Sequence, residues 1–296
     1  MREDVEFTSA GLTLRGWLYR PDGSAGDRPA VVMSHGFSAV KEQGLDGFAQ
    51  RFADAGMIVL VFDHRHLGSS DGDERGRIIY QEQQDDTRAA LGWLTQQTGV
   101  AVDRIGLWGS SYSGAHAIFL GAFDPRVNVV VAQVPGLDTV GTLIAMGGRE
   151  GFDGFLPVLA EDHARRNAGE SSAPLQVVAP GGEPSVLATP DSYEWFMASR
   201  SDAPNWLNQT TLESVSRAAE YKASAFIELV APKPLLVVAA VNDSLVPIEL
   251  VRDAFGRAGE PKKLVELDCG HFDVYPGGTH HDDAAGAAQE WFTSHL

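Results

Sequence analysis

Short apolar runs and segments with helical spacing alternate along the chain. Short runs of mainly apolar residues are typical of strands buried on both faces of a sheet. Six such runs occur, at residues 29–34, 57–62, 104–108, 127–133, 235–240 and 263–267. The segments between them predict helices, at residues 43–55, 81–97, 113–121 and 284–292. With an antiparallel hairpin at residues 5–7 and 12–19, this order predicts an α/β fold whose mostly parallel sheet is covered by helices on both faces.

One long segment interrupts this alternation. Residues 135–230 hold no convincing buried strand, and in them Gly, Pro and polar residues are interspersed with aromatic ones. Two stretches predict helices, residues 192–200 and 212–223. We expect this cap segment (residues 135–230) to be an insertion packed over the carboxyl edge of the sheet, and residues 1–134 and 231–296 to form the core.

A serine-rich turn, GSSYSG at residues 109–114, follows the third apolar run. A nucleophile elbow is a strained turn from a strand into a helix, so the residues two before and two after the nucleophile must be small. Ser111 meets this requirement with Gly109 and Ser113. Ser110 has large residues at both positions, and Ser113 lies deeper in the predicted helix. The turn therefore predicts Ser111 as a nucleophile, against the alternative of a serine-rich helix cap.

An acid and a histidine follow the ends of later strands. Asp243 comes after the fifth apolar run and His271 after the sixth. The carboxyl ends of neighbouring parallel strands meet at one edge of a sheet, where α/β folds place their sites. Alone, either residue could belong to an ordinary turn or loop. In the order Ser111, Asp243, His271 they predict a catalytic triad, with Asp268 as the rival acid because it lies three residues before His271.

The loop at residues 34–37, Ser-His-Gly-Phe, follows the first apolar run. Acyl transfer needs backbone N–H donors aimed at the developing oxyanion. We expect these donors from Tyr112, directly after the nucleophile, and from Phe37. Gly36 allows the backbone to approach closely, and we interpret His35 as a residue that orients this loop rather than as a base.

These motifs resemble the α/β-hydrolase superfamily. The resemblance spans nearly the whole chain outside the cap segment. It rests on the loop at 34–37, DHRHLGSS at 63–70, the serine elbow, Asn242-Asp243 and Gly270-His271-Phe272. The Ser-Ser-Tyr-Ser-Gly elbow and the stretch Trp206–Asn208 are similar to dienelactone-hydrolase-like, Xaa-Pro peptidase-like and polyketide-associated thiohydrolase groups. The resemblance implies an α/β-hydrolase fold with an inserted helical cap and a serine mechanism without a cofactor.

The charge and composition restrict the partners. Lys and Arg number 23 against 40 Asp and Glu, a formal net charge of −17, which argues against nucleic acid because phosphate binding needs clustered basic residues. No apolar run is as long as a membrane helix requires, and none follows the start at Met1, so we expect no membrane partner, no signal peptide and a cytoplasmic location. The single cysteine excludes an intrachain disulfide.

Several other polar residues carry weaker signals. We expect no metal, because catalytic zinc needs three converging ligands and adjacent histidines seldom converge on one ion, as in the densest cluster, His280-His281-Asp282-Asp283. His64 and His66 could touch substrate, although orienting a tight turn at residues 68–69 suits them better. Cys269 has no elbow around it, so we interpret it as a small apolar filler.

We therefore expect a serine hydrolase that cleaves a small-molecule carboxylic ester, with a thioester as second candidate, through an acyl-enzyme on Ser111. The acyl group is expected to be neutral and rather hydrophobic, with cap-segment aromatics lining its pocket: Trp195, Phe196 and Trp206. An Xaa-Pro peptidase or an acyltransferase could use the same triad, and a hydrolase scaffold kept as a binding module would show no turnover. The sequence does not decide between a monomer and a homodimer.

Overall fold

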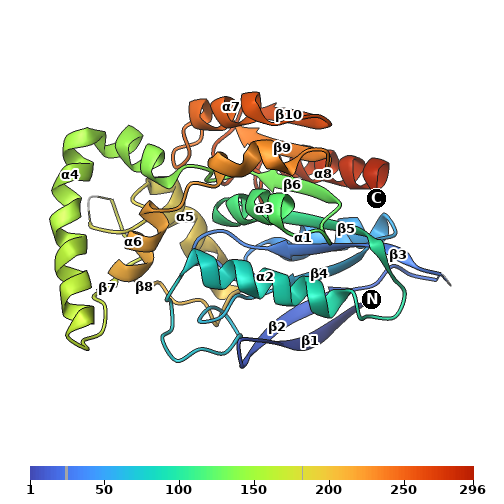
Figure 1. Cartoon of the computed structure of the whole chain (residues 1–296), viewed down its shortest axis with the longest axis horizontal. Helices are drawn as coiled ribbons and strands as arrows, with labels where there is room; N and C mark the ends of the chain where they lie inside the picture. The colour runs from blue at the N-terminus through green and yellow to red at the C-terminus, as the bar shows by residue number, and fades with distance from the viewer. Residues whose placement is uncertain (24–25, 182) are drawn as a thin grey trace.

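A central sheet of eight strands organises the molecule (Figure 1). The computed structural model describes residues 1–23, 26–181 and 183–296. The strands lie in the order β1-β2-β4-β3-β5-β6-β9-β10. Their bounds are β1 Arg2–Ser9, β2 Leu12–Tyr19, β3 Arg28–Ser34, β4 Ile58–Phe62, β5 Val100–Ser110, β6 Val129–Gln133, β9 Leu235–Ala240 and β10 Lys262–Leu267. From β4 to β10 every neighbouring pair is parallel, while β2 pairs antiparallel with both β1 and β4. The predicted mostly parallel α/β sheet is confirmed.

The parallel strands coincide with the six apolar runs, and all of them except the edge strand β10 are mostly buried. Strands β4, β6 and β9 are buried at every residue. Strand β10 lies at the sheet edge and has no fully buried residue. The predicted hairpin at the start of the chain forms β1 and β2, paired from Arg2 opposite Tyr19 to Ser9 opposite Leu12.

Helices cover both faces of the sheet. Alternate residues of a strand point to opposite faces, so Val32 of β3 joins one apolar layer and its neighbour Val31 joins the other. The first layer contains residues of α2 (Tyr80–Leu94), α3 (Tyr112–Phe123), α7 (Ile248–Arg257) and the 3-10 helix η2 (Ala223–Val230). The second contains residues of α1 (Leu45–Asp54) and α8 (His281–His295).

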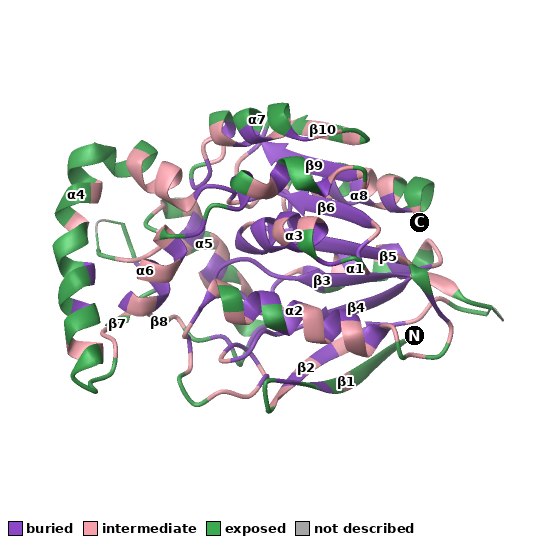
Figure 2. Ribbon diagram, viewed as in Figure 1, coloured by how far each residue is buried: buried purple, intermediate pink, exposed green. Residues whose placement is uncertain are grey.

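The cap segment is mainly helical in its described residues, which exclude residue 182. Its elements, besides η2, are α4 (Thr139–Asn167), β7 (Pro174–Leu175), α5 (Pro190–Ala198), η1 (Ser199–Ser201), β8 (Thr210–Thr211) and α6 (Leu212–Ala219). Helices α5 and α6 lie where the sequence predicts helices, whereas α4 is not predicted. Figure 2 shows that α4 is exposed over most of its length, and its regular backbone is broken at Gly148, with φ of 69°.

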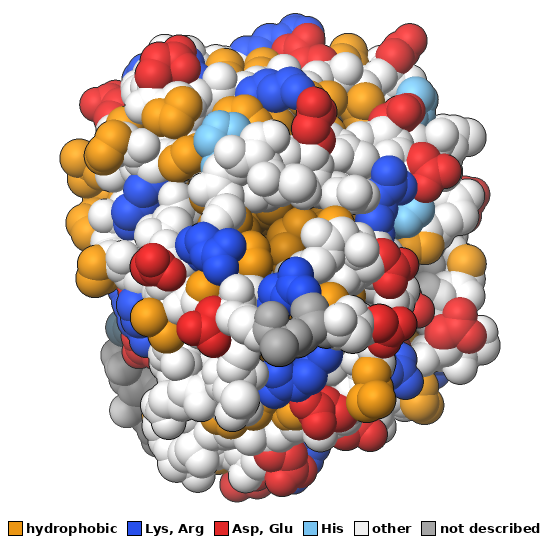
Figure 3. All heavy atoms as spheres, turned by 90° about the vertical axis from the view of Figure 1, so that its right-hand side faces the viewer, with side chains coloured by type: hydrophobic (Ala, Val, Ile, Leu, Met, Phe, Trp, Pro, Cys, Tyr) orange, Lys and Arg blue, Asp and Glu red, His pale blue; other side chains and the backbone are white. Residues whose placement is uncertain are grey.

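The molecular surface is mixed in charge at the end opposite α4. Figure 3 shows this face, on which acidic and basic side chains are interspersed around a recess with apolar side chains. Among the described helices, none combines the length and apolar character needed to cross a bilayer.

Candidate active site

Ser111 occupies a strained turn between β5 and α3. Its backbone has φ of 54° and ψ of −118°, a conformation that costs free energy for any residue with a side chain. The Ser111 N–H donates to the Gln133 carbonyl of the neighbouring strand β6 at 2.8 Å, which holds the turn. A Cβ atom at position 109 would lie 2.0 Å from the Ser113 carbonyl oxygen, so only glycine fits there. This is the strand–turn–helix geometry of a nucleophile elbow.

The structure brings Ser111, His271 and Asp243 together. The Ser111 Oγ lies 3.2 Å from His271 Nε2, and His271 Nδ1 lies 2.6 Å from Asp243 Oδ2. The side chains of His271 and Asp243 are only 1% and 2% exposed. The three residues follow the parallel strands β5, β9 and β10, whose carboxyl ends lie at the same edge of the sheet, so residues 160 positions apart in the chain meet there.

The carboxylate beside His271 belongs to Asp243, not to Asp268. Asp243 Oδ1 accepts hydrogen bonds from the N–H groups of Leu245 and Val246, each at 2.8 Å, which leaves Oδ2 for the imidazole. Asp268 instead accepts from the Asn242 side chain at 2.8 Å, at an exposed position. The buried acid is thus fixed by the turn after β9, and its charge is matched by three donors.

The loop after β3 approaches Ser111 closely. A Cβ atom at Gly36 would lie 2.8 Å from the Ser111 Cβ, so a side chain at this position would collide with the serine. Within the described residues, neither the Phe37 N–H nor the Tyr112 N–H donates to a protein acceptor. The Ser113 hydroxyl donates to the His35 carbonyl and joins this loop to the elbow. Two free backbone donors therefore flank the serine, where a bound oxyanion could use them.

His35 is a buried, neutral part of this loop. Its Nδ1 accepts the Gly36 N–H at 2.8 Å, and its Nε2 lies 2.6 Å from the Gln43 carbonyl, which assigns the proton to Nε2. Burial lowers the pKa of His35 to about 4. Its ring stacks on Tyr275 with centroids 5.6 Å apart, and the Tyr275 hydroxyl lies 2.6 Å from Ser110 Oγ. These contacts fix the loop.

Two cavities meet at Ser111. The larger, about 120 Å³, is lined mainly by apolar side chains of the cap segment and the turn after β9, and we call it the α4 cavity: Tyr112, Leu143, Met146, Val215 and Val246 among others. The smaller, about 20 Å³, we call the aromatic cavity, and its wall includes Trp195, Phe196, His271, Phe272 and Tyr275. Both also touch Phe37, Leu187 and Leu245.

The predicted cap aromatics divide between the cavity wall and the layer behind it. Trp195 and Phe196 lie at the aromatic cavity. Trp206 is buried behind them, stacked on Phe196 with ring centroids 5.1 Å apart, and it lines neither cavity at Ser111.

Sequence reasoning missed the α4 residues at the larger cavity. Thr139, Leu143 and Met146 line it from one side of α4, and their spacing of four and three residues is the spacing of one helix face. That spacing was the available signal. The Gly- and Pro-containing stretch that follows argues against a long helix, so the sequence does not predict α4.

The remaining candidates lie outside the two cavities. The His66 ring packs on the turn at Gly72, where a Cβ atom would lie 2.3 Å from its Nδ1, and neither it nor His64 lines a cavity at Ser111. Cys269 is buried, and burial raises the pKa of its thiol to about 11. In the part of the chain that the structure describes, no three His, Cys, Asp or Glu side chains group together as they would around a metal ion.

Comparisons with known proteins show to which family the chain belongs. The model of the X-Pro dipeptidyl-peptidase (S15) family matches residues 11–273. Polyketide transferase ATR5 of Stachybotrys chlorohalonatus is 31% identical over 288 residues, covering 93% of this chain and 92% of the relative. Thiohydrolase aneE of Aspergillus aculeatus is 32% identical over 304 residues, covering 97% and 89%. The crystal structure of the α/β hydrolase GrgF from Penicillium sp. superposes with a TM-score of 0.84 at 27% identity, covering 100% of this chain and 99% of that chain.

These similarities confirm the predicted α/β-hydrolase superfamily and support a hydrolase-type enzyme. The family match spans both the serine elbow and His271. The chain therefore belongs to the X-Pro dipeptidyl-peptidase (S15) family of α/β hydrolases.

Proposed function

We propose that this chain is a serine hydrolase that cleaves esters or thioesters of apolar carboxylic acids through an acyl-enzyme on Ser111. The observation that carries the proposal is the continuous series of contacts from Ser111 through His271 to the buried Asp243, at the junction of two cavities. A carbonyl carbon placed at this junction would lie between the serine and the free N–H groups of Phe37 and Tyr112.

The first half of the reaction forms the acyl-enzyme. Ser111 Oγ attacks the carbonyl carbon while His271 Nε2 takes the hydroxyl proton. Asp243 Oδ2 accepts a hydrogen bond from the Nδ1–H of His271, keeps the imidazole in the required tautomer and, remaining ionised, stabilises the imidazolium. The carbonyl oxygen takes up the negative charge beside the two backbone donors. The bond to the leaving group then breaks, and the departing oxygen or sulfur takes the proton from Nε2.

The second half releases the acid. A water molecule enters where the leaving group stood and gives a proton to His271 Nε2 as its oxygen attacks the acyl carbon. The bond from the carbonyl carbon to Ser111 Oγ breaks, and the serine recovers the proton from His271. An acceptor other than water in this step would give acyl transfer with the same residues.

The lining of the cavities favours an apolar acyl group over a dipeptide. An enzyme that removes dipeptides from a free N-terminus has to bind the terminal ammonium, and burying an unpaired charge is costly. Among the described residues that line the α4 cavity and the aromatic cavity, none is acidic. A peptide amine would therefore lack a counter-ion beside Ser111, although the family takes its description from such peptidases.

A thioester substrate is the second candidate. Two relatives that cover most of the chain are described as a thiohydrolase and a polyketide transferase, and their names point to acyl groups carried as thioesters or passed to an acceptor. The triad chemistry is the same for oxygen and sulfur leaving groups, and sulfur departs more readily because thiols are more acidic than alcohols.

Covalent labelling tests the nucleophile. We expect a fluorophosphonate probe to label the wild-type chain and Ser113→Ala but not Ser111→Ala, with circular dichroism confirming that each variant is folded. We also expect Ser111→Ala to reduce kcat on a p-nitrophenyl ester by about 10⁴-fold or more, because triad members act as a unit. Labelling of Ser111→Ala with loss in Ser113→Ala would move the nucleophile to Ser113. A folded wild type that neither labels nor turns over any ester would favour a binding module instead.

A further inference from the structure

The two cavities at Ser111 differ in their relation to His271. A leaving group has to reach His271 Nε2, because that atom supplies its proton. His271 lies on the wall of the aromatic cavity and not on the wall of the α4 cavity. Tyr112, whose N–H faces the oxyanion in the proposed mechanism, lies on the wall of the α4 cavity. The two cavities are therefore not interchangeable for the two halves of an ester.

We propose that the α4 cavity holds the acyl group, that the aromatic cavity holds the leaving group, and that Trp195 sets how large this leaving group can be. The assignment rests on the proposed function, since it needs Ser111 and His271 to act as described there. It reverses the sequence-based interpretation of Trp195 and Phe196, which placed them at the acyl chain. In their place, Leu143 and Met146 of α4 would limit the acyl group.

The volumes support this division. The α4 cavity, at about 120 Å³, has room for a chain of several carbons, whereas the aromatic cavity, at about 20 Å³, has room for little more than one small group. A third hollow of about 530 Å³, here called the outer groove, lies on the far side of Trp195 and Tyr275, which line both it and the aromatic cavity. Removing one of these two side chains would join the two spaces.

Of the two side chains that separate the spaces, Trp195 can be truncated with less disturbance than Tyr275. Tyr275 is buried and its hydroxyl bonds to Ser110. Trp195 is only half-buried, and its ring is held by packing alone among the described residues: Phe272 lies at 5.1 Å, Tyr275 at 5.1 Å and Phe196 at 4.9 Å between ring centroids. Truncation at this position therefore opens space without removing a hydrogen bond.

The outer groove determines which long leaving groups would fit once the partition opens. Its described lining includes three acidic side chains, Glu42, Asp46 and Asp202, and one basic side chain, Arg2, which lies over the Trp17 ring at 4.5 Å. This lining repels a polyanionic leaving group such as coenzyme A and suits a neutral or cationic one. The leaving-group class follows as a small or neutral alcohol or thiol.

Two substrate series separate the acyl side from the leaving-group side. The first series keeps methanol as a small leaving group and lengthens the acyl chain from two to ten carbons, with acid release followed by pH-stat. The second keeps acetate and enlarges the alcohol from methyl to benzyl to naphthylmethyl, with acid release followed by pH-stat. A pair of butyryl thioesters, one on N-acetylcysteamine and one on coenzyme A, tests the effect of the charge of the leaving group.

The variants are Trp195→Ala, Trp195→Phe and Leu143→Phe. The controls are Trp291→Ala, in α8, and Leu156→Ala, on the exposed side of α4.

We expect Trp195→Ala to raise kcat/KM for the naphthylmethyl ester relative to the methyl ester by about tenfold or more, the scale on which pocket volume discriminates substrates. Trp195→Phe should give a smaller change in the same direction, and both should leave the acyl ranking as it is. Leu143→Phe should shift the acyl optimum to shorter chains and leave the alcohol ranking unchanged. In every variant the N-acetylcysteamine thioester should react faster than the coenzyme A thioester, and the controls should preserve both rankings.

Other outcomes overturn the inference while keeping the hydrolase. If Trp195→Ala and Trp195→Phe both reorder the acyl series, or both leave the alcohol series unchanged, Trp195 does not bound the leaving group. If Leu143→Phe alters only the alcohol series, the two sites are exchanged. Absence of wild-type turnover on both series together with absence of fluorophosphonate labelling would instead reject the proposed function itself.

Discussion

At the scale of single residues, Ser113 joins the two halves of the site. The familiar G-x-S-x-G elbow has glycine at this position, and serine is tolerated because it is small. Its hydroxyl donates to the carbonyl of His35, two residues before Phe37. The serine thus links the elbow, which carries the nucleophile, to the loop that presents one of the two free N–H groups. A glycine at this position could not make that link.

The pair of acids near His271 provides the sharpest residue test. Asp243→Asn keeps the shape of the side chain but cannot hold the imidazole in the same tautomer, so we expect kcat to fall by about 10⁴-fold with the fold intact. Asp268→Asn should retain near-normal turnover, because Asp268 bonds only to the Asn242 side chain. Steady-state kinetics on one ester, with circular dichroism for each variant, decides the matter. Collapse of activity in Asp268→Asn and retention in Asp243→Asn would transfer the role.

His35 should make stability depend on pH. Its pKa is about 4 in the folded chain because burial disfavours the imidazolium, whereas an unfolded histidine has a pKa near 6.5. Between these values the unfolded state binds more protons, so the free energy of unfolding falls as the pH falls. We expect His35 to contribute a loss of about 2 kcal/mol between pH 7 and pH 5. Burial lowers the pKa of His116 in the same direction.

Urea denaturation at the two pH values measures this effect. His35→Gln should be less stable at pH 7, because it loses buried contacts, and should show a smaller drop between pH 7 and pH 5 than wild type. His295→Gln, which changes an exposed histidine at the end of α8, should show the wild-type drop. An unchanged drop in His35→Gln would mean that other groups cause the pH dependence.

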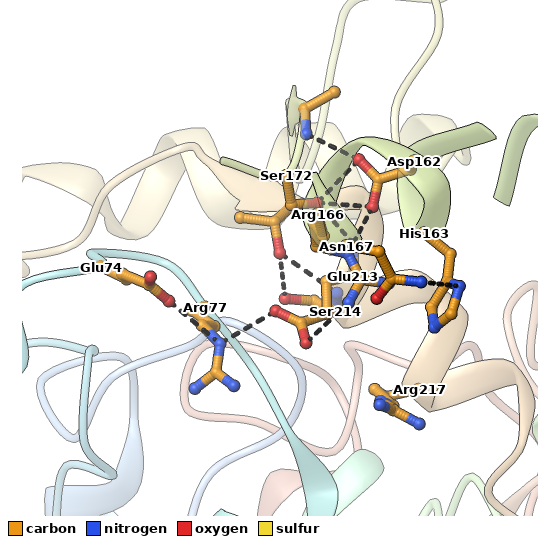
Figure 4. A network of polar contacts seen from close by, with 12 residues as sticks. Glu74, Arg77, Asp162, His163, Arg166, Asn167, Ser172, Glu213, Ser214 and Arg217 are labelled. Atoms are coloured by element: carbon orange, nitrogen blue, oxygen red, sulfur yellow. Dashed lines mark hydrogen bonds and ion pairs between the residues drawn. The ribbon is translucent and has the colours of Figure 1, made fainter. Parts of the chain in front are cut away.

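At the scale of elements, a charged cluster joins α4 and α6 to the core (Figure 4). Glu213 of α6 contacts Arg166 of α4 at 3.2 Å and Arg77, in the segment before α2, at 3.0 Å. Its backbone N–H also donates to Ser172 Oγ at 2.9 Å. The three charged side chains are between 15% and 19% exposed, so these contacts are only partly screened by solvent.

Glu213→Gln should loosen the second half of α4. The substitution keeps the volume of the side chain and removes the charge that both arginines face. We expect amide hydrogen exchange in residues 149–167 to accelerate by about tenfold or more, because hydrogen bonds to a charged group contribute roughly 1.5–3 kcal/mol, with exchange in β4 and β9 unchanged. Arg149→Gln is the matched control on the same helix. It breaks an exposed pair with Asp153, and such pairs contribute little. Equal exchange in both variants would contradict this anchoring role.

The sequence predicts those elements whose burial can be inferred from the polarity of their own residues. Strands β4 and β9 are apolar throughout, and β6 is apolar up to its last residue, Gln133, because both faces of these strands are covered. The strand ends bring Ser111, Asp243 and His271 into reach in the predicted order. Helix α4 is different. Its described buried residues are only Leu159 and Asp162, and Asp162 accepts bonds from Arg166, Ser172 and Ala173. Because tertiary contacts rather than an apolar stripe hold this helix, its length could not be predicted, although the spacing of Thr139, Leu143 and Met146 indicates the helical face that lines the α4 cavity.

At the scale of the whole molecule, the site is an apolar junction within a strongly acidic protein. The described lining of both cavities at Ser111 carries no acidic side chain, while the chain as a whole has a net charge of −17. Acidic side chains line the outer groove, which Trp195 separates from the aromatic cavity. A substrate therefore crosses a negative field before it reaches an uncharged site, and this field acts on the approach more than on the chemical step.

The field should select against anionic esters in a salt-dependent manner. We expect p-nitrophenyl butyrate to have a higher kcat/KM than mono-p-nitrophenyl succinate, an anionic ester of similar length, and the ratio to shrink as NaCl is raised. The Debye length falls from roughly 20 Å at about 0.02 M salt to roughly 4 Å at about 0.5 M, so repulsion from charges outside the cavity fades while contacts inside it persist. The neutral ester controls for general salt effects and should change little. A ratio that stays constant across this range would place the discrimination in the cavity wall, through desolvation of the carboxylate, and not in the charge of the molecule.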